Sequence, residues 1–441
     1  MKGGSGVAFT GGGCATLTDL YNAQSGSSGP LFVLNSGDKV VSGSPTGRWL
    51  LTSGLEILDG VTLLVHGTSD GGDADVLRIE STDDDFWEIR AWGGNLSFKG
   101  TTVTSWDTDR GGERTKHDGG RSFINCVTQF DDSDKWSCDG RSNKERGECR
   151  MDIIDSTMGN LGWKDAESYG LTWKVRGFCK NLSNGEIFED HNVYGDIKGS
   201  EIYGMYYGMY SYGHQGGVWT NNIMRDNFIY GFDPHDDSDD LTIADNVVFG
   251  NGNHGIIASK RCNNVEIYNN EVYDGEEAGI FLHRSSDNAK VYNNYVHDNK
   301  DAGIAMLESF GAEIYDNTIE NCKYGIRLSL GSADNDIHDN TFDSISTYGL
   351  YTYTGSDSPD VSGNSGGRPN NNVFNNNIIS KTDVGVKMKE GDDNTFTKNV
   401  FTGAKTFELD DATGTTWTSN VIGSACLKES SDFASGSIPK C

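Results

Sequence analysis

The strongest constraint on the fold is a repeat of about 24 residues in the C-terminal half of the chain. From Asn222 one asparagine recurs at steps of 24, 24, 24, 23 and 23 residues, and a glycine keeps the same register from Gly231. Each unit contains short β-branched and aromatic runs, such as VEIY and GIFL, bounded by Asn, Asp and Gly. Runs of this kind are typical of strands. The recurring asparagines are Asn222, Asn246, Asn270, Asn294, Asn317 and Asn340, followed after an insertion by Asn376, Asn399 and Asn420.

A unit of this length cannot bury its apolar face alone, but stacked units can. The repeat therefore predicts an all-β protein, a right-handed parallel β-helix with about 22–24 residues per coil. Leucine-rich horseshoes and propellers need L-x-x-L-x-L patterns or longer blades, which are missing. The recurring asparagine is expected to be a turn residue that adopts a left-handed backbone and hydrogen-bonds its counterpart one coil away.

The N-terminal half repeats less regularly. LEILDGVTLLVHG, LSFKGTTVTSWD, MDIIDSTMGN and SYGLTWKVRG resemble further coils, interrupted by a long charged loop at about 107–150. The expected division is an N-terminal segment at 1–44, a catalytic β-helix at 45–425 and a tail at 426–441.

Net charge limits the partners of this chain. With 36 Lys+Arg against 65 Asp+Glu, the formal charge is −29, so no nucleic acid and no anionic membrane surface is expected as a partner. No apolar run is long enough to cross a membrane, and the first residues have no apolar signal region.

The cysteines favour an oxidising compartment. Cys126, Cys138 and Cys149 lie close together, Cys426 and Cys441 bracket the tail, and no C-x-x-C zinc spacing occurs. The odd total of 9 leaves at least one thiol free. Sequons begin at Asn95 and Asn181. These features predict a secreted, extracellular protein of a cell wall or matrix.

Alignment of the coils on their glycines predicts which side chains face outward. Residues alternate along a strand, so Phe232 and Pro234 should point to the core, and Asp233 and His235 to solvent. Stacking at about 4.8 Å then predicts a ladder of outward residues on one face. The two outward columns comprise Tyr210, Asp233, Ile257, Phe281, Ala305, Arg327 and Tyr351, and Tyr212, His235, Ser259, His283, Leu307, Ser329 and Tyr353.

The coil YGFDPH places Asp-Pro-His where other coils have aliphatic residues, and such departures are expected at functional sites. The competing interpretation is an ordinary surface histidine in an acidic loop. Cations beside exposed tyrosines favour a groove for an extended acidic polymer, although they could instead balance local acids. These cations are Lys260, Arg261, Arg284, Arg327, Lys387 and Lys389.

The stretch YGFDPHDDSDDLTIADNVVFGNGNHGIIASK resembles the YG-x-DPHD motif and following coil of mannuronan (alginate) C-5 epimerases. LSFKGTTVTSWD, GNLGWKDAESYGLTW and YYGMYSY are also similar to segments before that motif in bacterial periplasmic enzymes, so the resemblance covers most of 45–350. The cysteine-bearing inserts, the sequons and the lack of G-G-x-G-x-D repeats are similar to the secreted brown-algal enzymes.

The resemblance implies epimerisation of β-D-mannuronate to α-L-guluronate within the alginate polymer, by proton removal at carbon 5 and reprotonation from the opposite face. The base would then be His235, and Asp233 would orient the imidazole or help bind the carboxyl group. Tyr230 matches the opposite-face acid, a role that water could also fill. The carboxylate-neutralising arginine follows HGII-x-S in the family; here HGIIASKR places Lys260 at that position and Arg261 one residue later.

An alternating strand would turn Arg261 outward with Ser259, but a turn beginning at Lys260 would cancel that argument. The choice between the two cations stays open at this stage. Lys174, four residues after Gly170, falls in the column of His235, and Lys198 precedes the aromatic coil; each also has a structural interpretation. The expected substrate-binding residues are Tyr210, Tyr212, Ser259, Phe281, His283, Arg284, Arg327, Lys174 and Lys198.

Two rival functions remain at this stage. A polyuronate lyase shares the proton abstraction and then expels the 4-linked sugar, and a non-catalytic wall-binding β-helix would have the groove without the reaction. A pectin hydrolase is less consistent, because no carboxylate pair is evident. The expected protein is a monomer that uses no cofactor; HDDSDD could bind calcium, but it has no EF-hand or nonapeptide spacing.

Overall fold

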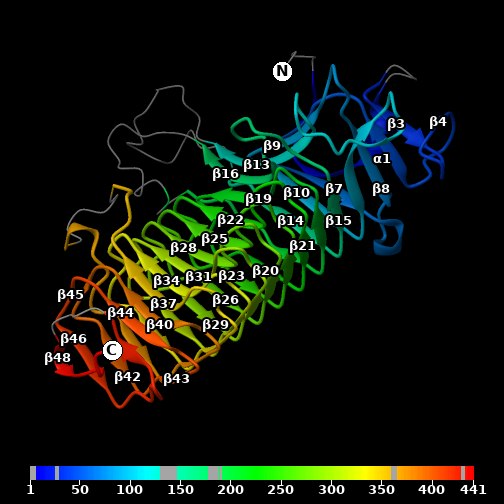
Figure 1. Cartoon of the computed structure of the whole chain (residues 1–441). Helices are drawn as coiled ribbons and strands as arrows, with labels where there is room; N and C mark the ends of the chain where they lie inside the picture. The colour runs from blue at the N-terminus through cyan, green and yellow to red at the C-terminus, as the bar shows by residue number, and fades with distance from the viewer. Residues whose placement is uncertain are drawn as a thin grey trace, which may run out of the picture. The chain divides into compact units, whose positions relative to one another are not determined.

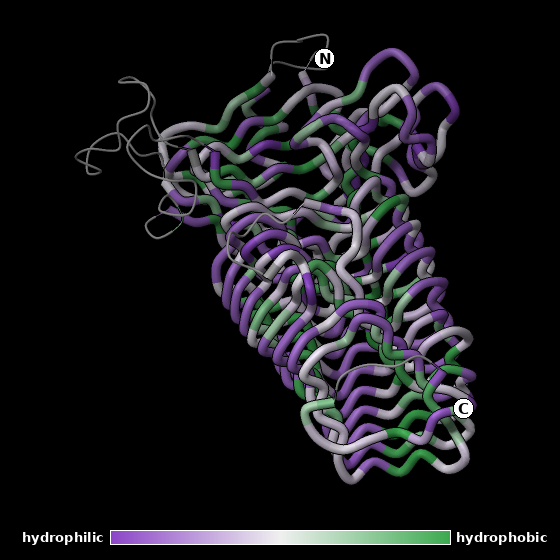
Figure 2. The backbone as a smooth tube through the Cα atoms, turned by 60° about the vertical axis from the view of Figure 1, so that its left-hand side comes forward, coloured by the Kyte–Doolittle hydropathy of each residue, from purple (hydrophilic) through white to green (hydrophobic). Residues whose placement is uncertain are grey.

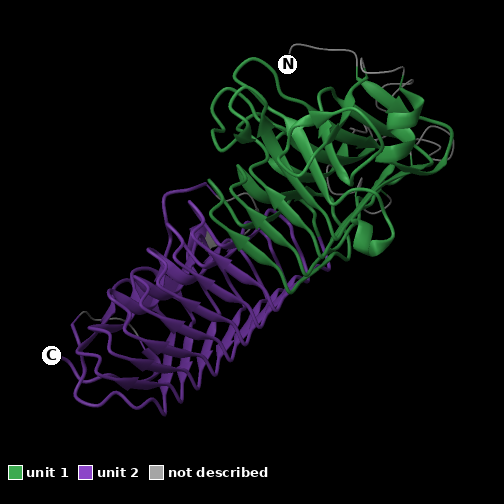
Figure 3. Cartoon of the chain, turned by 90° about the vertical axis from the view of Figure 1, so that its right-hand side faces the viewer, with its two compact units in different colours: residues 1–238 green, residues 239–441 purple. Residues whose placement is uncertain are grey.

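The computed structural model describes residues 6–24, 29–129, 147–176, 188, 191–358, 365–428 and 433–441. They belong to two compact units, residues 1–238 and 239–441 (Figure 3). In each unit the chain winds through three sheets, and strands of successive coils pair side by side in parallel (Figure 1). Each unit is therefore a parallel β-helix, as the repeat predicts.

In the first unit, the first sheet carries the DPH strand. Its order is β1 (Val7–Phe9), β6 (Leu55–Leu58), β9 (Glu88–Trp92), β13 (Phe123–Gln129), β16 (Gly170–Arg176), β19 (Tyr207–Tyr212) and β22 (Phe232–His235). The second sheet runs β2 (Gly13–Thr16), β7 (Val61–His66), β10 (Asn95–Lys99), β14 (Met151–Ile154), β17 (Ile197–Lys198) and β20 (Val218–Thr220).

The third sheet of the first unit begins with antiparallel strands and continues in parallel. Its order is β4 (Val40–Val41), β3 (Leu31–Leu34), β5 (Arg48–Leu51), β8 (Val76–Glu80), β11 (Thr102–Asp107), β15 (Thr157–Gly159), β18 (Glu201–Tyr203) and β21 (Ile223–Arg225), with β12 (Gly112–Glu113) antiparallel to β11. Helix α1 (Leu17–Ala23) begins at a capping box formed by Thr16 and Asp19. A short 3-10 helix, η2, spans Thr68–Asp70.

In the second unit the same three positions recur. The first sheet contains β25 (Ile256–Ser259), β28 (Ile280–His283), β31 (Ala302–Leu307), β34 (Tyr324–Ser329), β37 (Tyr348–Tyr353), β40 (Val384–Met388), β44 (Thr406–Leu409) and β47 (Cys426–Leu427). The second contains β23 (Thr242–Ala244), β26 (Glu266–Tyr268), β29 (Lys290–Tyr292), β32 (Glu313–Tyr315), β35 (Asp336–His338), β38 (Val373–Asn375), β42 (Thr395–Thr397), β46 (Thr415–Thr418) and β48 (Phe433–Gly436).

The third sheet of the second unit contains β24 (Val247–Phe249), β27 (Glu271–Tyr273), β30 (Tyr295–His297), β33 (Thr318–Glu320), β36 (Thr341–Asp343), β39 (Ile378–Ser380) and β43 (Val400–Thr402). A separate two-stranded ladder joins β41 (Gly391–Asp392) and β45 (Ala412–Thr413), and the 3-10 helix η4 spans Ser365–Gly367.

The core of each coil comes from the middle residue of these short strands. Ile267, Val291, Ile314 and Ile337 pair in register across four coils, and each is fully buried. Their neighbours along each strand are more exposed, so hydrophobic and hydrophilic segments alternate along the coils in Figure 2. Stacking buries a continuous apolar stripe that no single repeat could bury.

The asparagine ladder exists, but two details differ from the prediction. The buried ladder residue after the insertion is Asn377, which accepts from the backbone N–H and the amide of Asn340, and not Asn376. The left-handed residue is the one before each ladder asparagine, such as Asn269 (φ 56°) or Asn293 (φ 54°). The chain turns at this left-handed residue. The side-chain amide of the asparagine that follows is therefore buried inside the turn, where it hydrogen-bonds to its counterparts in the adjacent coils.

Substitution of Asn294 by alanine tests the ladder. Asn294 Oδ1 accepts from the backbone N–H and the amide of Asn270, each at 3.0 Å, and its own amide donates to Ile267 O at 2.9 Å. The substitution leaves these buried groups without partners, so we expect the free energy of unfolding to fall by about 3 kcal/mol. Urea unfolding measures it. The control Asn293→Gly, which keeps the left-handed backbone of an exposed neighbour, should change stability by less than about 0.5 kcal/mol; equal losses in both would contradict a buried ladder.

The predicted loop at 107–150 is partly wrong, because it contains strands β12 and β13. The stretch FINCVTQ pairs with β9 and β16 as an ordinary coil strand. Charged residues on both sides obscure its pattern in the sequence. The segments LEILDGVTLLVHG, LSFKGTTVTSWD, MDIIDSTMGN and SYGLTWKVRG do form strands, as predicted.

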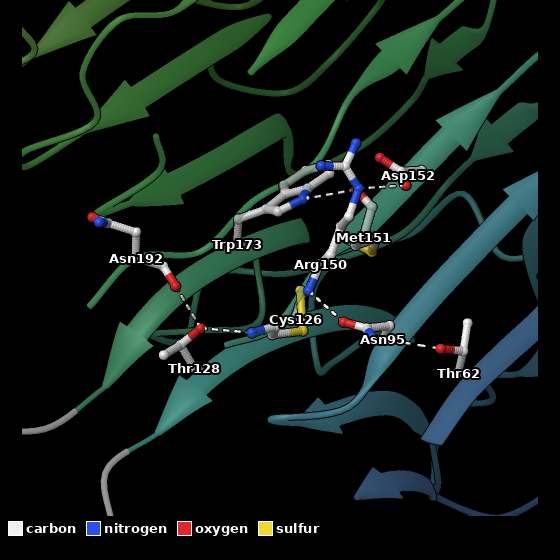
Figure 4. The surroundings of a disulfide bond; sticks show 10 residues. Thr62, Asn95, Cys126, Thr128, Arg150, Met151, Asp152, Trp173 and Asn192 are labelled. Atoms are coloured by element: carbon white, nitrogen blue, oxygen red, sulfur yellow. Dashed lines mark hydrogen bonds and ion pairs between the residues drawn. A yellow bond between two sulfur atoms is a disulfide. The ribbon is translucent and has the colours of Figure 1, made fainter. Parts of the chain in front are cut away.

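Disulfides join Cys126 to Cys149 and Cys426 to Cys441, in line with the expected oxidising compartment. Around the first bond, Thr128 Oγ1 accepts from Cys149 N at 2.7 Å and donates to Asn192 O at 2.8 Å (Figure 4). Cys138 and Cys179 lie outside the described residues, as does the sequon at Asn181. Among the described cysteines, Cys14 and Cys322 carry free thiols.

The sequon at Asn95 lies inside strand β10. Its side chain accepts from Arg150 N at 2.9 Å and donates to Thr62 Oγ1 at 3.5 Å (Figure 4). The N-terminal segment predicted at 1–44 contributes β1 and β2, which pair with β6 and β7. The boundaries proposed at residues 44 and 425 stay a prediction.

Candidate active site

Strand β22 presents Asp233 and His235 on the outer side of the first sheet. Its register with β19 pairs Met209 with Phe232, Tyr210 with Asp233, Ser211 with Pro234 and Tyr212 with His235. Met209, Ser211 and Phe232 are fully buried, which confirms the predicted alternation of core and outward residues within this unit. The columns Tyr210–Asp233 and Tyr212–His235 are therefore correct.

The backbone after His235 turns sharply and is held by hydrogen bonds. Asp236 and Asp237 adopt left-handed conformations (φ 34° and 55°). Ser238 Oγ donates to His235 O at 2.8 Å and lies 2.9 Å from Ser211 Oγ, and Gly213 N donates to Asp236 O at 2.9 Å. The acidic stretch is thus an ordered turn that fixes the position of His235, and not only a solvated loop.

The imidazole of His235 is partly exposed and oriented by its neighbour. The carboxylate of Asp236 contacts Nδ1, and 22% of the His235 side chain is exposed. A carboxylate at Nδ1 favours the tautomer with its proton on that nitrogen, which leaves the Nε2 lone pair as a proton acceptor. The ring centroid of Tyr210 lies 5.5 Å away.

The prediction that Asp233 faces solvent is wrong, because only 1% of this residue is exposed. It is in the outward column with Tyr210, close enough to Tyr169, Tyr207 and Tyr210 for its charge to raise the pKa of all three. Both carboxylate oxygens are buried, and among the described residues neither has a hydrogen-bond partner. Burial is the main cause that raises the pKa of Asp233 to about 7, with Asp236 adding to the rise and His235 opposing it. An unpaired buried carboxyl of this kind is expected at functional sites.

The tyrosines of this cluster come from three successive coils. The ring of Tyr207 lies 4.5 Å from Tyr169 and 5.1 Å from Tyr230, and Tyr210 lies 5.1 Å from Tyr169. Burial, reinforced by the charge of Asp233, raises the pKa of Tyr207 and of Tyr210. Sequence reasoning identified Tyr230 and Tyr210 but not Tyr169 or Tyr207. The Tyr-Gly pairs at 169–170, 207–208 and 230–231 are the signal that could have found them.

Lys174 lies where the sequence predicts, whereas Lys198 does not share this face. Lys174 pairs with Tyr212 in the column of His235, with its Nζ 5.2 Å from the Tyr212 ring and 3.0 Å from Glu167 Oε1. Lys198 belongs to the second sheet and contacts Asp196 Oδ2 at 2.9 Å. It is therefore not brought together with His235 in this unit.

In the second unit, the outward column on β25 and β28 is in the predicted register. Ser259 pairs with His283, and Ser259 Oγ lies 2.9 Å from His283 Nδ1. Ile257, Ser259 and Phe281 are nevertheless buried, contrary to the expected exposure. The ring of His254 packs against that of Phe281, with the centroids 4.8 Å apart.

The cations of the second unit mostly contact acids. Arg284 lies 3.5 Å from Glu308, Arg327 lies 3.1 Å from Asp301, and Lys387 lies 3.3 Å from Glu408. This agrees with the alternative that these cations balance local acids. An anionic ligand would have to compete with those carboxylates.

Strand β25 ends at Ser259, and both Lys260 (φ 63°) and Arg261 (φ 59°) are left-handed. A turn therefore begins at Lys260, and strand alternation does not select Arg261. Both cations lie in the second unit and His235 in the first, so their convergence on one sugar stays a prediction. Among the described residues, no group of three or more His, Cys, Asp or Glu side chains could hold a metal ion.

Comparison with known proteins shows which families and structures this chain is similar to. A family model described as right handed beta helix region matches residues 236–366, and one described as periplasmic copper-binding protein (NosD) matches residues 179–289. The first match agrees with the predicted handedness.

Two curated relatives are named mannuronan C5-epimerase. That of Pseudomonas fluorescens is 37% identical over 112 residues, 25% of this chain and 20% of the relative. That of Pseudomonas syringae pv. tomato is 30% identical over 175 residues, 39% of this chain and 28% of the relative. The matched part of the chain thus spans 20% and 28% of the length of these two relatives.

Solved structures have a similar fold over most of this chain. The periplasmic alginate epimerase AlgG has a TM-score of 0.67 at 21% identity, covering 93% of this chain and 84% of that one. The A-module of the Azotobacter vinelandii mannuronan C-5 epimerase AlgE4 has a TM-score of 0.51 at 16% identity, covering 77% and 86%. The chain is a right-handed parallel β-helix protein similar to the mannuronan C5-epimerases, in sequence over part of its length and in fold over most of it.

Proposed function

We propose that this protein is a mannuronan C5-epimerase, which converts β-D-mannuronate to α-L-guluronate within alginate. The observation that carries the proposal is the pair of outward residues on β22: an oriented imidazole, His235, two residues from a buried, unpaired carboxyl, Asp233. The similarity to proteins named mannuronan C5-epimerase supports the choice of substrate.

His235 is the proposed base. The carbon-5 proton of a uronate lies next to a carboxylate, so its removal builds negative charge that the site must stabilise. A base must reach that proton directly, and histidine titrates close to neutral pH. Asp236 at Nδ1 holds the ring so that Nε2 can accept the proton.

Asp233 is the proposed partner of the substrate carboxylate. Since its pKa is raised to about 7, a large share of this group is protonated at neutral pH. A neutral carboxyl next to the substrate would not repel the substrate carboxylate, whereas an ionised one would. Lys260 or Arg261 is proposed to supply the remaining positive charge.

Tyr230 is the proposed acid that returns a proton to the opposite face of carbon 5. Its ring adjoins Tyr207, so it belongs to the tyrosine group around Asp233. Sugar rings are proposed to pack on Tyr210 and Tyr212, with Lys174 beside the Tyr212 ring. Ser259, Phe281, His283, Arg284 and Arg327 stay proposals for subsites in the second unit, and Lys198 is the weakest candidate because it lies on another sheet.

Incubation with polymannuronate tests the reaction. We expect proton NMR to show guluronate signals, and in deuterated water the carbon-5 position to gain solvent hydrogen without loss of chain length. A lyase would instead produce unsaturated, ultraviolet-absorbing ends, and a binding protein would leave the polymer unchanged. Either of these results rejects the proposed epimerase.

Export from the cytoplasm is also proposed. The disulfides support it, as do the periplasmic descriptions of the AlgG neighbour and the NosD family model. No helix in the described part of the chain is long and apolar enough to cross a membrane. A monomeric state and a place in a cell wall or matrix stay predictions.

A further inference from the structure

A row of aromatic rings leads away from His235 within the first unit. We call it the aromatic track, and it comprises Tyr210, Tyr169, Tyr207, Tyr206, Phe228 and His117. The track continues beyond the tyrosines around Asp233 to rings that the proposed reaction does not use.

The rings follow one another closely. From His235 the centroid steps are 5.5 Å to Tyr210, 5.1 Å to Tyr169, 4.5 Å to Tyr207 and 5.4 Å to Tyr206. The last steps are 5.4 Å from Tyr206 to Phe228 and 4.0 Å from Phe228 to His117. The row is therefore continuous.

The far end of the track is held in place by the coils beneath it. Tyr206 and Phe228 occupy the connections that precede β19 and β22, where Phe228 N donates to Met205 O at 2.8 Å and Ile229 N to Tyr206 O at 2.9 Å. His117 belongs to the segment between β12 and β13. Beside it, buried Arg121 donates to Thr115 O at 3.1 Å, Leu161 O at 2.9 Å and Gly204 O at 2.8 Å.

The direction of the track follows from these positions. His235 is the last residue of β22, and Phe228 lies before the first. The track therefore runs parallel to the strands, from the end of β22 toward the connection that precedes it. The column Lys174, Tyr212 and His235 instead runs perpendicular to the strands, from coil to coil.

Phe228 is 48% exposed, among the most exposed large apolar side chains described. The other rings of the track are half-buried, and the open faces of rings in a row can pack against the apolar faces of sugar rings. The phenol and phenyl rings of the track are uncharged at neutral pH, since an ordinary tyrosine pKa is about 10 and burial raises the pKa of each of the four tyrosines further. Burial, reinforced by Arg121 and opposed by Asp118, lowers the pKa of His117. On a chain with a net charge of −29, an uncharged strip can accept a polyanion without repelling it.

We propose that the aromatic track is a subsite that binds the part of a polyuronate chain beyond the reacting sugar, and that it directs this chain across the sheet toward Phe228 and His117. The inference rests on the proposed function for the identity of the polymer. It differs from the groove that the sequence suggests, which runs from coil to coil toward Arg327 and Tyr351.

Kinetics with substrates of different length test the track. In the full chain, we expect Phe228→Ala combined with His117→Ala to raise KM for polymannuronate about tenfold, with a smaller change in kcat. KM for short oligomannuronates should rise less, so that the advantage of long chains shrinks. Phe228→Leu keeps the apolar bulk without the flat ring, so it should still raise KM. This single variant keeps the test valid if the double variant does not fold.

Tyr295→Ala is the matched control. Tyr295 is 38% exposed and lies on the third sheet of the second unit, whereas the track belongs to the first sheet and the loops of the first unit, so KM should stay within about twofold of the unmodified chain. An unchanged KM for polymannuronate in the folded track variants overturns the proposal. So does a loss of affinity with Tyr351→Ala when the track variants bind normally.

Calorimetric binding of polymannuronate separates this inference from the proposed function. If the unmodified chain binds the polymer without forming guluronate, the epimerase assignment fails by itself. Weaker binding by the double variant then still supports the track, and equal binding still overturns it.

Discussion

Replacement of His235 by alanine is expected to lower the rate of guluronate formation by at least about a hundred- to a thousandfold. The substitution removes the proposed base while leaving the Phe232 and Pro234 packing of β22 in place. Initial rates from proton NMR measure the loss. Binding of polymannuronate should persist, because the tyrosines around the site remain.

His338→Ala is a matched control for that variant. His338 also contacts the aspartate that follows it, with Nδ1 2.8 Å from Asp339 Oδ2, and its side chain is 20% exposed against 22% for His235. It lies on the second sheet of the second unit, so its loss should leave the rate within about twofold. Full activity in the His235 variant, or equal losses in both, would remove His235 from the mechanism.

Asp233→Asn is expected to change how stability depends on pH. The carboxyl has a reference pKa of 3.8 and a folded pKa of about 7, so the folded protein holds the proton more tightly. Stability is then greatest below the unfolded pKa and falls as pH rises from about 4 to about 7. The fall is on the order of 4 kcal/mol.

Asparagine keeps the shape of the neutral acid and does not titrate. We expect Asp233→Asn to flatten this part of the pH profile and to stabilise the protein at pH 8 by on the order of 2–4 kcal/mol, while epimerisation slows. Urea unfolding at several pH values, with activity measured in parallel, tests both effects.

Asp107→Asn, in the same unit, is expected to change stability at pH 8 in the opposite direction from Asp233→Asn. Asp107 is 2% exposed, and Arg114 Nη1 donates to it at 3.0 Å. Burial would raise its pKa, but hydrogen bonds from Arg110 and Arg114 lower it. That stabilisation is present above the unfolded pKa and is lost as pH falls, so Asp107→Asn should destabilise the protein at pH 8. A destabilised Asp233→Asn protein at pH 8 would show that the Asp233 carboxyl is satisfied in its ionised form.

Much of the fold could be predicted because repetition averages out local ambiguity. A single run such as VEIY is weak evidence for a strand, but its recurrence with a fixed asparagine and glycine specifies both coil length and register. Coils of irregular length were harder to predict. Strand β13 was missed because its neighbours in sequence are charged, and Asn376 was chosen over Asn377 because two asparagines adjoin after the insertion.

The sequence predicted which residues of the candidate site share an outward column, but it did not predict how deeply those residues are buried. Alternation places Asp233 and His235 outward, and the register confirms the columns within each unit. Alternation cannot reveal that Tyr169 and Tyr207, from other coils, lie close enough to Asp233 for its charge to raise their pKa. Nor can it show that Lys260 and Arg261 both turn left-handed, which removes the argument from alternation.

The sequence by itself determined the parallel β-helix, its period and the strand that carries Asp233 and His235, because each depends on spacing along the chain. Only the tertiary structure decided the electrostatic state of the site. The pKa of Asp233 depends on its burial, and the tyrosines whose own pKa its charge raises lie 26 and 64 residues earlier in the chain, at Tyr207 and Tyr169. Solvent exclusion is a property of packed neighbours, which strand alternation does not specify.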